Sequence, residues 1–157
     1  MDPDVQIHSV LLIGTGPVAS RVFLDNLSAV MIERFKKKGV NAEFSYVGKL
    51  QASSSRNLDS LVNDRFDSYL LFKASDSSYL DMTKTKSVII GPGITGSHIG
   101  NQYAQDYKLQ LFQKRERMHL VWDGKLNIDF DLANNSRYEY ISNMIFKGLS
   151  KDVVQLK

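Results

Sequence analysis

The stretch from Val10 to Ser20 constrains this chain most, because it joins an apolar strand to a helix through two closely spaced glycines. Its first four residues form a continuous apolar run, which is typical of a strand buried on both faces. Gly14 and Gly16 permit a tight turn, and Pro17 suits the first position of a helix. The stretch therefore predicts a strand, a tight turn and a helix in direct succession.

The same turn has a second interpretation, because Gly14-x-Gly16-x-x-Ala19 has the outline of a dinucleotide-binding turn. Such a site also needs an acidic residue at the end of the second strand, where it holds the ribose hydroxyls. The second strand of this chain ends at Tyr46 to Lys49 without an acid. The sequence thus favours a structural turn. The alternative is a nucleotide site made by Gly14, Thr15 and Gly16, with Arg21 near a phosphate.

Strand and helix patterns alternate in the first half of the chain. Apolar residues recur at three- and four-residue spacing after the turn, which predicts a helix that ends at three lysines and Gly39. Three elements are expected to follow: an alternating strand over 40–47, a short amphipathic helix over 58–66 and an apolar strand over 69–72.

The second half has a different pattern, dominated by antiparallel strands. A short buried strand is expected at 88–90, and a long hairpin with one apolar face at 107–132. Gly124 is the expected position of a β-bulge in that hairpin. Ser136 and Glu139 have the spacing of a capping box, which predicts the start of the last helix.

The resulting element order is β-α-β-α-β-β-β-α, which predicts a two-layer α/β sandwich with a mixed sheet and helices on one face. A length of 157 residues suits one domain with a full core and is too short for two ordinary ones. We therefore expect residues 1–157 to form a single α/β domain.

Composition excludes several classes of site. The chain has no cysteine, which rules out disulfides, thiolate metal sites and thiol nucleophiles. Its net charge of +3 comes from 20 basic and 17 acidic residues. The longest basic run, Lys36 to Lys38, lies where a helix is expected to end and where the helix dipole favours cations. No nucleic-acid partner is therefore predicted.

The glycine-rich stretch from Gly91 to Gly100 is the most loop-like candidate for a ligand or partner contact, through Thr95, Ser97 and His98. Its spacing fits neither the Gly-x-Ser-x-Gly turn of hydrolases nor the ending of a phosphate-binding P-loop. No catalytic residue, cofactor or metal site is predicted.

Polar residues of the hairpin alternate with its apolar face and are expected to be solvated. They include His119, Asp123, Asp129 and Asp131. The three aspartates could attract a cation, but protection of the sheet edge is the favoured interpretation.

Five segments together resemble a known group of domains: 19–27, 66–71, 107–112, 120–126 and 138–145. In pattern they resemble small envelope lipoprotein domains of Gram-negative bacteria, especially uncharacterised ones from Bacteroidetes. The element order is also similar to that of the amino-terminal domain of TolB, a protein of the Tol system. The resemblance spans nearly the whole chain and rests on pattern rather than on invariant motifs.

The resemblance implies a non-enzymatic protein-interaction domain of the cell envelope that binds another envelope protein. It implies a location in the periplasm or at the outer membrane, reached through a leader and a lipid-bearing cysteine that have been removed. The sequence itself contains neither feature, and taken literally it indicates a cytoplasmic protein. No functional residue of that group can be matched to a position here.

Overall fold

The computed structural model describes residues 5–48, 61–75, 102–152 and 154–156. These residues form seven strands and two long helices, α1 and α4. In chain order the elements are β1 (Val5–Ile7), β2 (Ser9–Gly14), α1 (Val18–Lys37), β3 (Asn41–Tyr46), β4 (Ser68–Ala74), β5 (Gln102–Lys114), β6 (Met118–Asp131), α4 (Asn135–Asp152) and β7 (Val154–Leu156).

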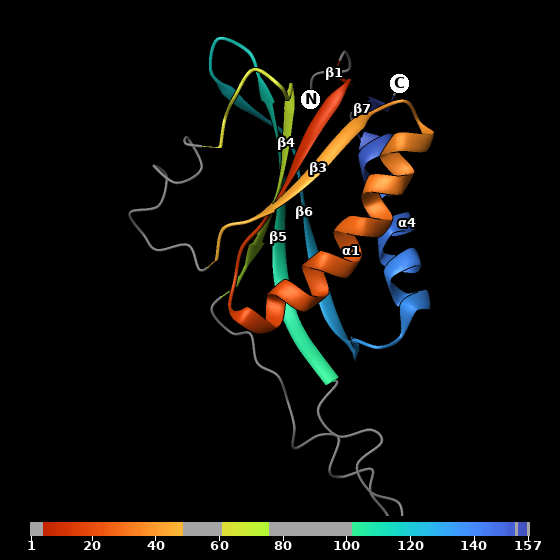
Figure 1. Cartoon of the computed structure of the whole chain (residues 1–157). Helices are drawn as coiled ribbons and strands as arrows, with labels where there is room; N and C mark the ends of the chain where they lie inside the picture. The colour runs from red at the N-terminus through yellow and green to blue at the C-terminus, as the bar shows by residue number, and fades with distance from the viewer. Residues whose placement is uncertain (1–4, 49–60, 76–101, 153, 157) are drawn as a thin grey trace, which may run out of the picture.

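The main sheet is mixed and has the strand order β3-β2-β4-β5-β6. β2 pairs in parallel with both β3 and β4, whereas β4, β5 and β6 are antiparallel to one another. α1 and α4 lie side by side on one face of this sheet (Figure 1). The predicted two-layer α/β sandwich with a mixed sheet is confirmed.

The larger part of the core lies between the sheet and the two helices. Side chains at alternate positions of β2, such as Val10 and Leu12, pack here against Phe23, Leu27 and their neighbours. The expected apolar face of α1 is buried, and the helix ends as predicted, with Gly39 at a positive φ of 76°.

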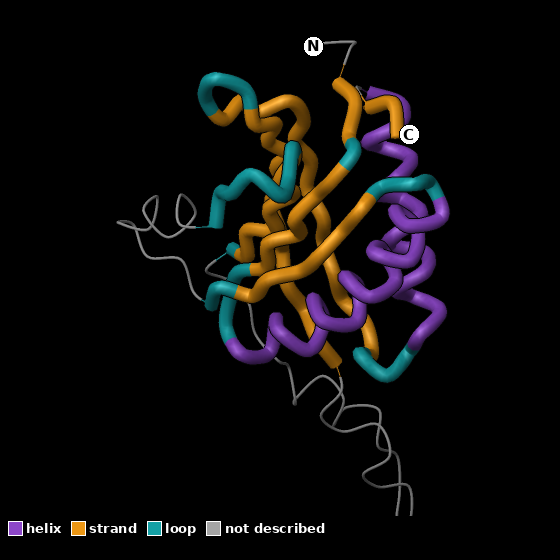
Figure 2. Tube along the Cα trace, turned by 45° about the horizontal axis from the view of Figure 1, so that its top comes forward, coloured by secondary structure: helices purple, strands orange, loops and turns teal. Residues whose placement is uncertain are grey.

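A smaller apolar cluster lies on the opposite face of the sheet, where Leu11, Ile13, Tyr69 and Leu71 pack against Phe66. Residues 61–66 cover this cluster as a turn and irregular chain, as the loop tube in Figure 2 shows. The predicted helix over 58–66 is therefore wrong in its described part, and residues 58–60 lie outside the described ranges.

Local hydrogen bonds explain why this segment is not helical. The side-chain oxygen of Asn63 accepts the backbone N–H of Arg65 at 2.8 Å. The hydroxyl of Tyr69 accepts the N–H of Asn63 and donates to its carbonyl, both at 3.0 Å. Asparagine competes in this way with helical backbone bonding, so the apolar spacing is satisfied by a turn instead.

The long hairpin is confirmed, but the bulge predicted at Gly124 is wrong. The register shifts between Leu111 and Phe112, so Val121 is the residue of β6 that has no register partner. Gly124 is instead covered by an indole, because a Cβ there would lie 2.9 Å from Cη2 of Trp122. The bulge places Leu120 opposite Phe112, on the face away from the helices, where it is 50% exposed.

The predicted capping box of the last helix is also wrong. α4 begins at Asn135, so Ser136 lies within its first turn. The Ser136 hydroxyl bonds to the side-chain oxygen of Asn134 at 2.7 Å. The Glu139 carboxylate accepts a bond from Arg34 of α1 at 2.9 Å rather than reaching back to the helix start.

β1 and β7 were not predicted. They form a separate two-stranded parallel sheet in which Val5 pairs with Val154 and Ile7 with Leu156. Each strand has only three residues, which is too short for an alternation signal. The predicted strand at 88–90 lies outside the described residues.

The β2–α1 turn generates a first prediction. A Cβ at Gly16, whose φ is +127°, would lie 2.8 Å from the Cβ of Ala74. Gly48 also has a positive φ, of 76°, but nothing lies within 4 Å of the position that a Cβ would take there. We expect Gly16→Ala to lower the free energy of unfolding by about 1–3 kcal/mol more than Gly48→Ala, because only Gly16 adds overpacking to backbone strain. Urea unfolding of both variants measures the difference, and equal losses would contradict it.

Candidate functional site

The glycine turn uses its own backbone donors within the fold. The N–H of Thr15 bonds to the carbonyl of Phe72 at 3.1 Å, and the N–H of Gly16 bonds to the carbonyl of Gly48 at 2.9 Å. The Thr15 hydroxyl donates to Phe72 O and accepts the N–H of Ala74. A phosphate cradle needs such donors free. The contacts therefore favour the structural interpretation of the turn.

Arg21, the expected phosphate contact of the nucleotide alternative, is turned toward other groups. Its guanidinium carbon lies 5.6 Å from the centroid of the Tyr46 ring, and its Nε lies 3.7 Å from the Asp25 carboxylate. The Tyr46 hydroxyl donates to the carbonyls of Gly16 and Pro17. The structure thus brings Gly14, Thr15, Gly16 and Arg21 together around Tyr46, in an arrangement closed by internal contacts.

A chain of hydroxyls beside this turn was not foreseen. Ser20 Oγ lies 2.6 Å from Tyr103 Oη, which lies 2.8 Å from Tyr107 Oη. All three side chains are buried, and both tyrosine rings stack on Phe23. Burial raises the pKa of Tyr107 and of Tyr103 above the ordinary tyrosine value, so both hydroxyls stay neutral. Tyr107 lies within the predicted hairpin, whose alternating pattern carries no signal for the hydroxyl pairing.

Of the other predicted candidates, some lie apart from one another in the structure, and a second group lies outside the described residues. Thr95, Ser97 and His98 belong to the second group, so the structure does not test the loop that contains them. His119 is exposed on β6, as expected. In the ranges that the structure describes, no three histidine, aspartate or glutamate side chains gather as a metal site requires.

A row of three lysines crosses the sheet on the face away from the helices. Lys73 of β4 pairs in register with Lys108 of β5, and Lys108 pairs with Lys125 of β6. All three are exposed, and no ion pair involves them in the described part of the chain. Like charges directly opposite one another destabilise a sheet, by up to about 1 kcal/mol per pair. Asp106 and Asp123 flank the row two residues along β5 and β6.

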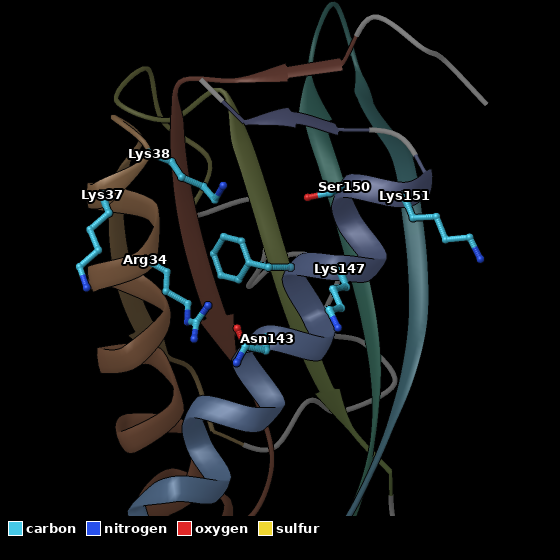
Figure 3. Close-up of a pocket in the computed structure, with 8 residues that line it drawn as sticks. Arg34, Lys37, Lys38, Asn143, Lys147, Ser150 and Lys151 are labelled. Atoms are coloured by element: carbon cyan, nitrogen blue, oxygen red, sulfur yellow. The ribbon is translucent and has the colours of Figure 1, made fainter.

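A basic groove of about 730 Å³ lies on the other side of the molecule, between the carboxyl-terminal halves of α1 and α4 (Figure 3). Sequence reasoning treated Lys36 to Lys38 as a helix end and could not foresee that α4 brings further cations beside them. The residues that line this groove are Arg34, Lys37, Lys38, Asn143, Phe146, Lys147, Ser150 and Lys151.

No protein-family model matches the chain, and no curated protein matches it in sequence. Neither of the two helices in the described part is long and apolar enough to cross a membrane.

The hydroxyl chain generates a prediction about stability. Tyr103→Phe removes the hydroxyl between Ser20 and Tyr107, and the loss should lower the free energy of unfolding by about 1–3 kcal/mol. Tyr140→Phe is the matched control, because Tyr140 is 57% exposed and should change stability by less than about 0.5 kcal/mol. Urea unfolding at neutral pH compares the two variants.

Tyr103 and Tyr107 also make the stability of the fold depend on pH. Their pKa values are raised in the folded state, so the folded state keeps protons that the unfolded state loses above pH 10, the ordinary tyrosine value. Stability should therefore fall as pH rises above about 10, and fall less steeply in Tyr103→Phe. A fall of equal slope in both proteins would contradict the assignment.

The nucleotide alternative is tested by thermal melting with NAD, NADP, FAD, ATP or S-adenosylmethionine at about 1 mM. A ligand present at a hundred times its dissociation constant would add roughly 2.7 kcal/mol, which is several degrees for a domain of this size. Because the turn's donors are already bonded, we expect no shift. A clear shift that is lost in Gly16→Val would instead establish a cofactor site.

Proposed function

We propose that the chain is a non-enzymatic interaction domain of the Gram-negative cell envelope, periplasmic or lipid-anchored, which docks another envelope protein through the exposed lysines on the face of β4, β5 and β6 away from the helices. The observation that carries this proposal is the row of Lys73, Lys108 and Lys125 in direct register. An arrangement that costs the isolated domain stability is explained if a partner supplies the compensating charge.

The rest of this face supports a protein partner rather than a small ligand. The row spans three neighbouring strands. Phe112 and the exposed Leu120 form an apolar pair on the same face, near the turn of the hairpin. A charged region beside apolar contacts is the common composition of a protein interface. We therefore infer a partner with an acidic surface.

Site-specific photo-crosslinking tests the proposal in living cells. A photoreactive residue at Asn127, which is exposed beside the lysine row, should capture one envelope protein. The same residue at Val18, which is 82% exposed at the start of α1, is the control and should capture none. The double variant Lys73→Glu and Lys108→Glu should abolish capture at Asn127 while the protein stays folded, as a cooperative melting transition would show.

The affinity of the purified domain for the purified captured protein then tests whether the lysines form the interface. Affinity for the captured protein should fall at least about tenfold in the double variant, because two favourable charge contacts become repulsive. Equal capture at both positions, or unchanged affinity in the double variant, would remove the sheet face as the interface. Fractionation that places the native protein in the cytoplasm would refute the envelope assignment, and turnover of a substrate by the purified domain would refute the non-enzymatic one.

A further inference from the structure

The basic groove is a second surface, on elements that the sheet-face proposal does not use. Arg34 and Lys38 extend from α1 into the space between the helices, and Lys147 stands on α4 (Figure 3). Phe146 packs against Phe35 with ring centroids 4.7 Å apart, which holds the two helices together below the groove. The groove therefore has an apolar base and basic sides.

The charges of the groove are unbalanced. Arg34 bonds to Glu139, so this pair contributes little net charge. The buried Nε of Arg34 has no hydrogen-bond acceptor among the residues that the structure describes. The groove also contains four lysines that make no ion pair in the described part of the chain: Lys37, Lys38, Lys147 and Lys151.

An exposed apolar pair lies on the solvent side of α4, outside the residues that line the groove. Tyr140 is 57% exposed and Met144 is 48% exposed. With Lys147 and Lys151 they follow a spacing of four, three and four residues, which places all four on one side of the helix. One half of this stripe is therefore apolar, and the other half is cationic.

We propose that the groove and this stripe dock an acidic amphipathic helix of a partner protein. Its carboxylates would face the four lysines, and its apolar residues would cover Tyr140 and Met144. A helix that lies in a groove between two helices is an established mode of peptide recognition.

Other anionic ligands fit the groove less well. α1 and α4 both end beside it, so their dipoles present partial negative charge and no free backbone N–H groups to a compact phosphate. Among the residues that line the groove, Arg34 carries the one guanidinium, and its Nη2 already donates to Glu139. A bilayer is a flat surface and cannot enter the recess at Arg34. An acidic helix avoids both restrictions, because its carboxylates can meet lysine side chains one at a time.

Selection from a random peptide library tests the proposal. Displayed 14-residue peptides are selected on the wild-type protein and counter-selected on the double variant Lys147→Glu and Lys151→Glu, both positions being exposed. We expect enriched peptides to combine aspartate or glutamate with apolar residues at helical spacing. Failure to enrich any peptide, or enrichment of neutral or basic ones, would overturn the proposal.

Affinities of one enriched peptide then locate the site. Binding should weaken about tenfold or more in the double variant, because each reversal replaces an attraction with a repulsion, and it should also weaken in Met144→Ser. Lys36→Glu is the control and should leave the affinity unchanged. Lys36 lies in the same turn of α1 as Lys37, but it does not line the groove.

Two further measurements separate this proposal from its competitors. Lys73→Glu with Lys108→Glu should leave peptide binding unchanged, so the groove and the sheet face can fail independently. Vesicles containing phosphatidylglycerol, and inorganic phosphate, are assayed on the same variants. The proposal would be overturned if no peptide bound and if vesicles or phosphate bound the wild-type protein but not the double variant Lys147→Glu and Lys151→Glu. The groove would then be a site for that ligand.

Discussion

The fold depends on how closely the β2–α1 turn approaches its neighbours. A Cβ at Gly14 would lie 2.8 Å from a methyl of Leu24 and 2.9 Å from the ring of Phe44, so a larger residue at the end of β2 would have to displace these two side chains. Thr15 then joins the turn to β4 through its hydroxyl and its N–H. This contact fixes the start of α1 over the middle of the sheet. Since interiors pack densely, the position of the whole helix layer follows from it.

Most of the fold could be predicted because its signals are local. Four consecutive apolar residues mark β2, and alternation over part of their length marks β5 and β6. Errors arose where a competing local interaction was decisive. The Asn63 side chain stabilises a turn in a segment whose apolar residues have helical spacing. Gly124 suggested a bulge, but the residue is a glycine because the Trp122 ring lies close to where a Cβ would be. β1 and β7 pair across nearly the full length of the chain, and no local pattern reports such a pairing.

The candidate sites could not be predicted, because each consists of residues that are ordinary in their own segment. Lys37 ends one helix and Lys147 lies near the end of another, 110 residues later, so each alone reads as a complement to a helix dipole. The packing of α1 against α4, which includes Phe35 on Phe146, places both lysines at one groove. The lysine row likewise needs the register of three strands, and an alternating pattern does not determine register.

The small β1–β7 sheet determines how tension would pass through the molecule. The two strands are parallel, and they lie close to the two ends of the chain (Figure 1). A force that pulls these ends apart therefore slides one strand along the other and loads all of their hydrogen bonds together. The main sheet and the two helices, which carry the lysine row and the basic groove, bear no load until β1 and β7 separate. A domain stretched between two attachment points would thus keep both surfaces intact up to the rupture of six paired residues.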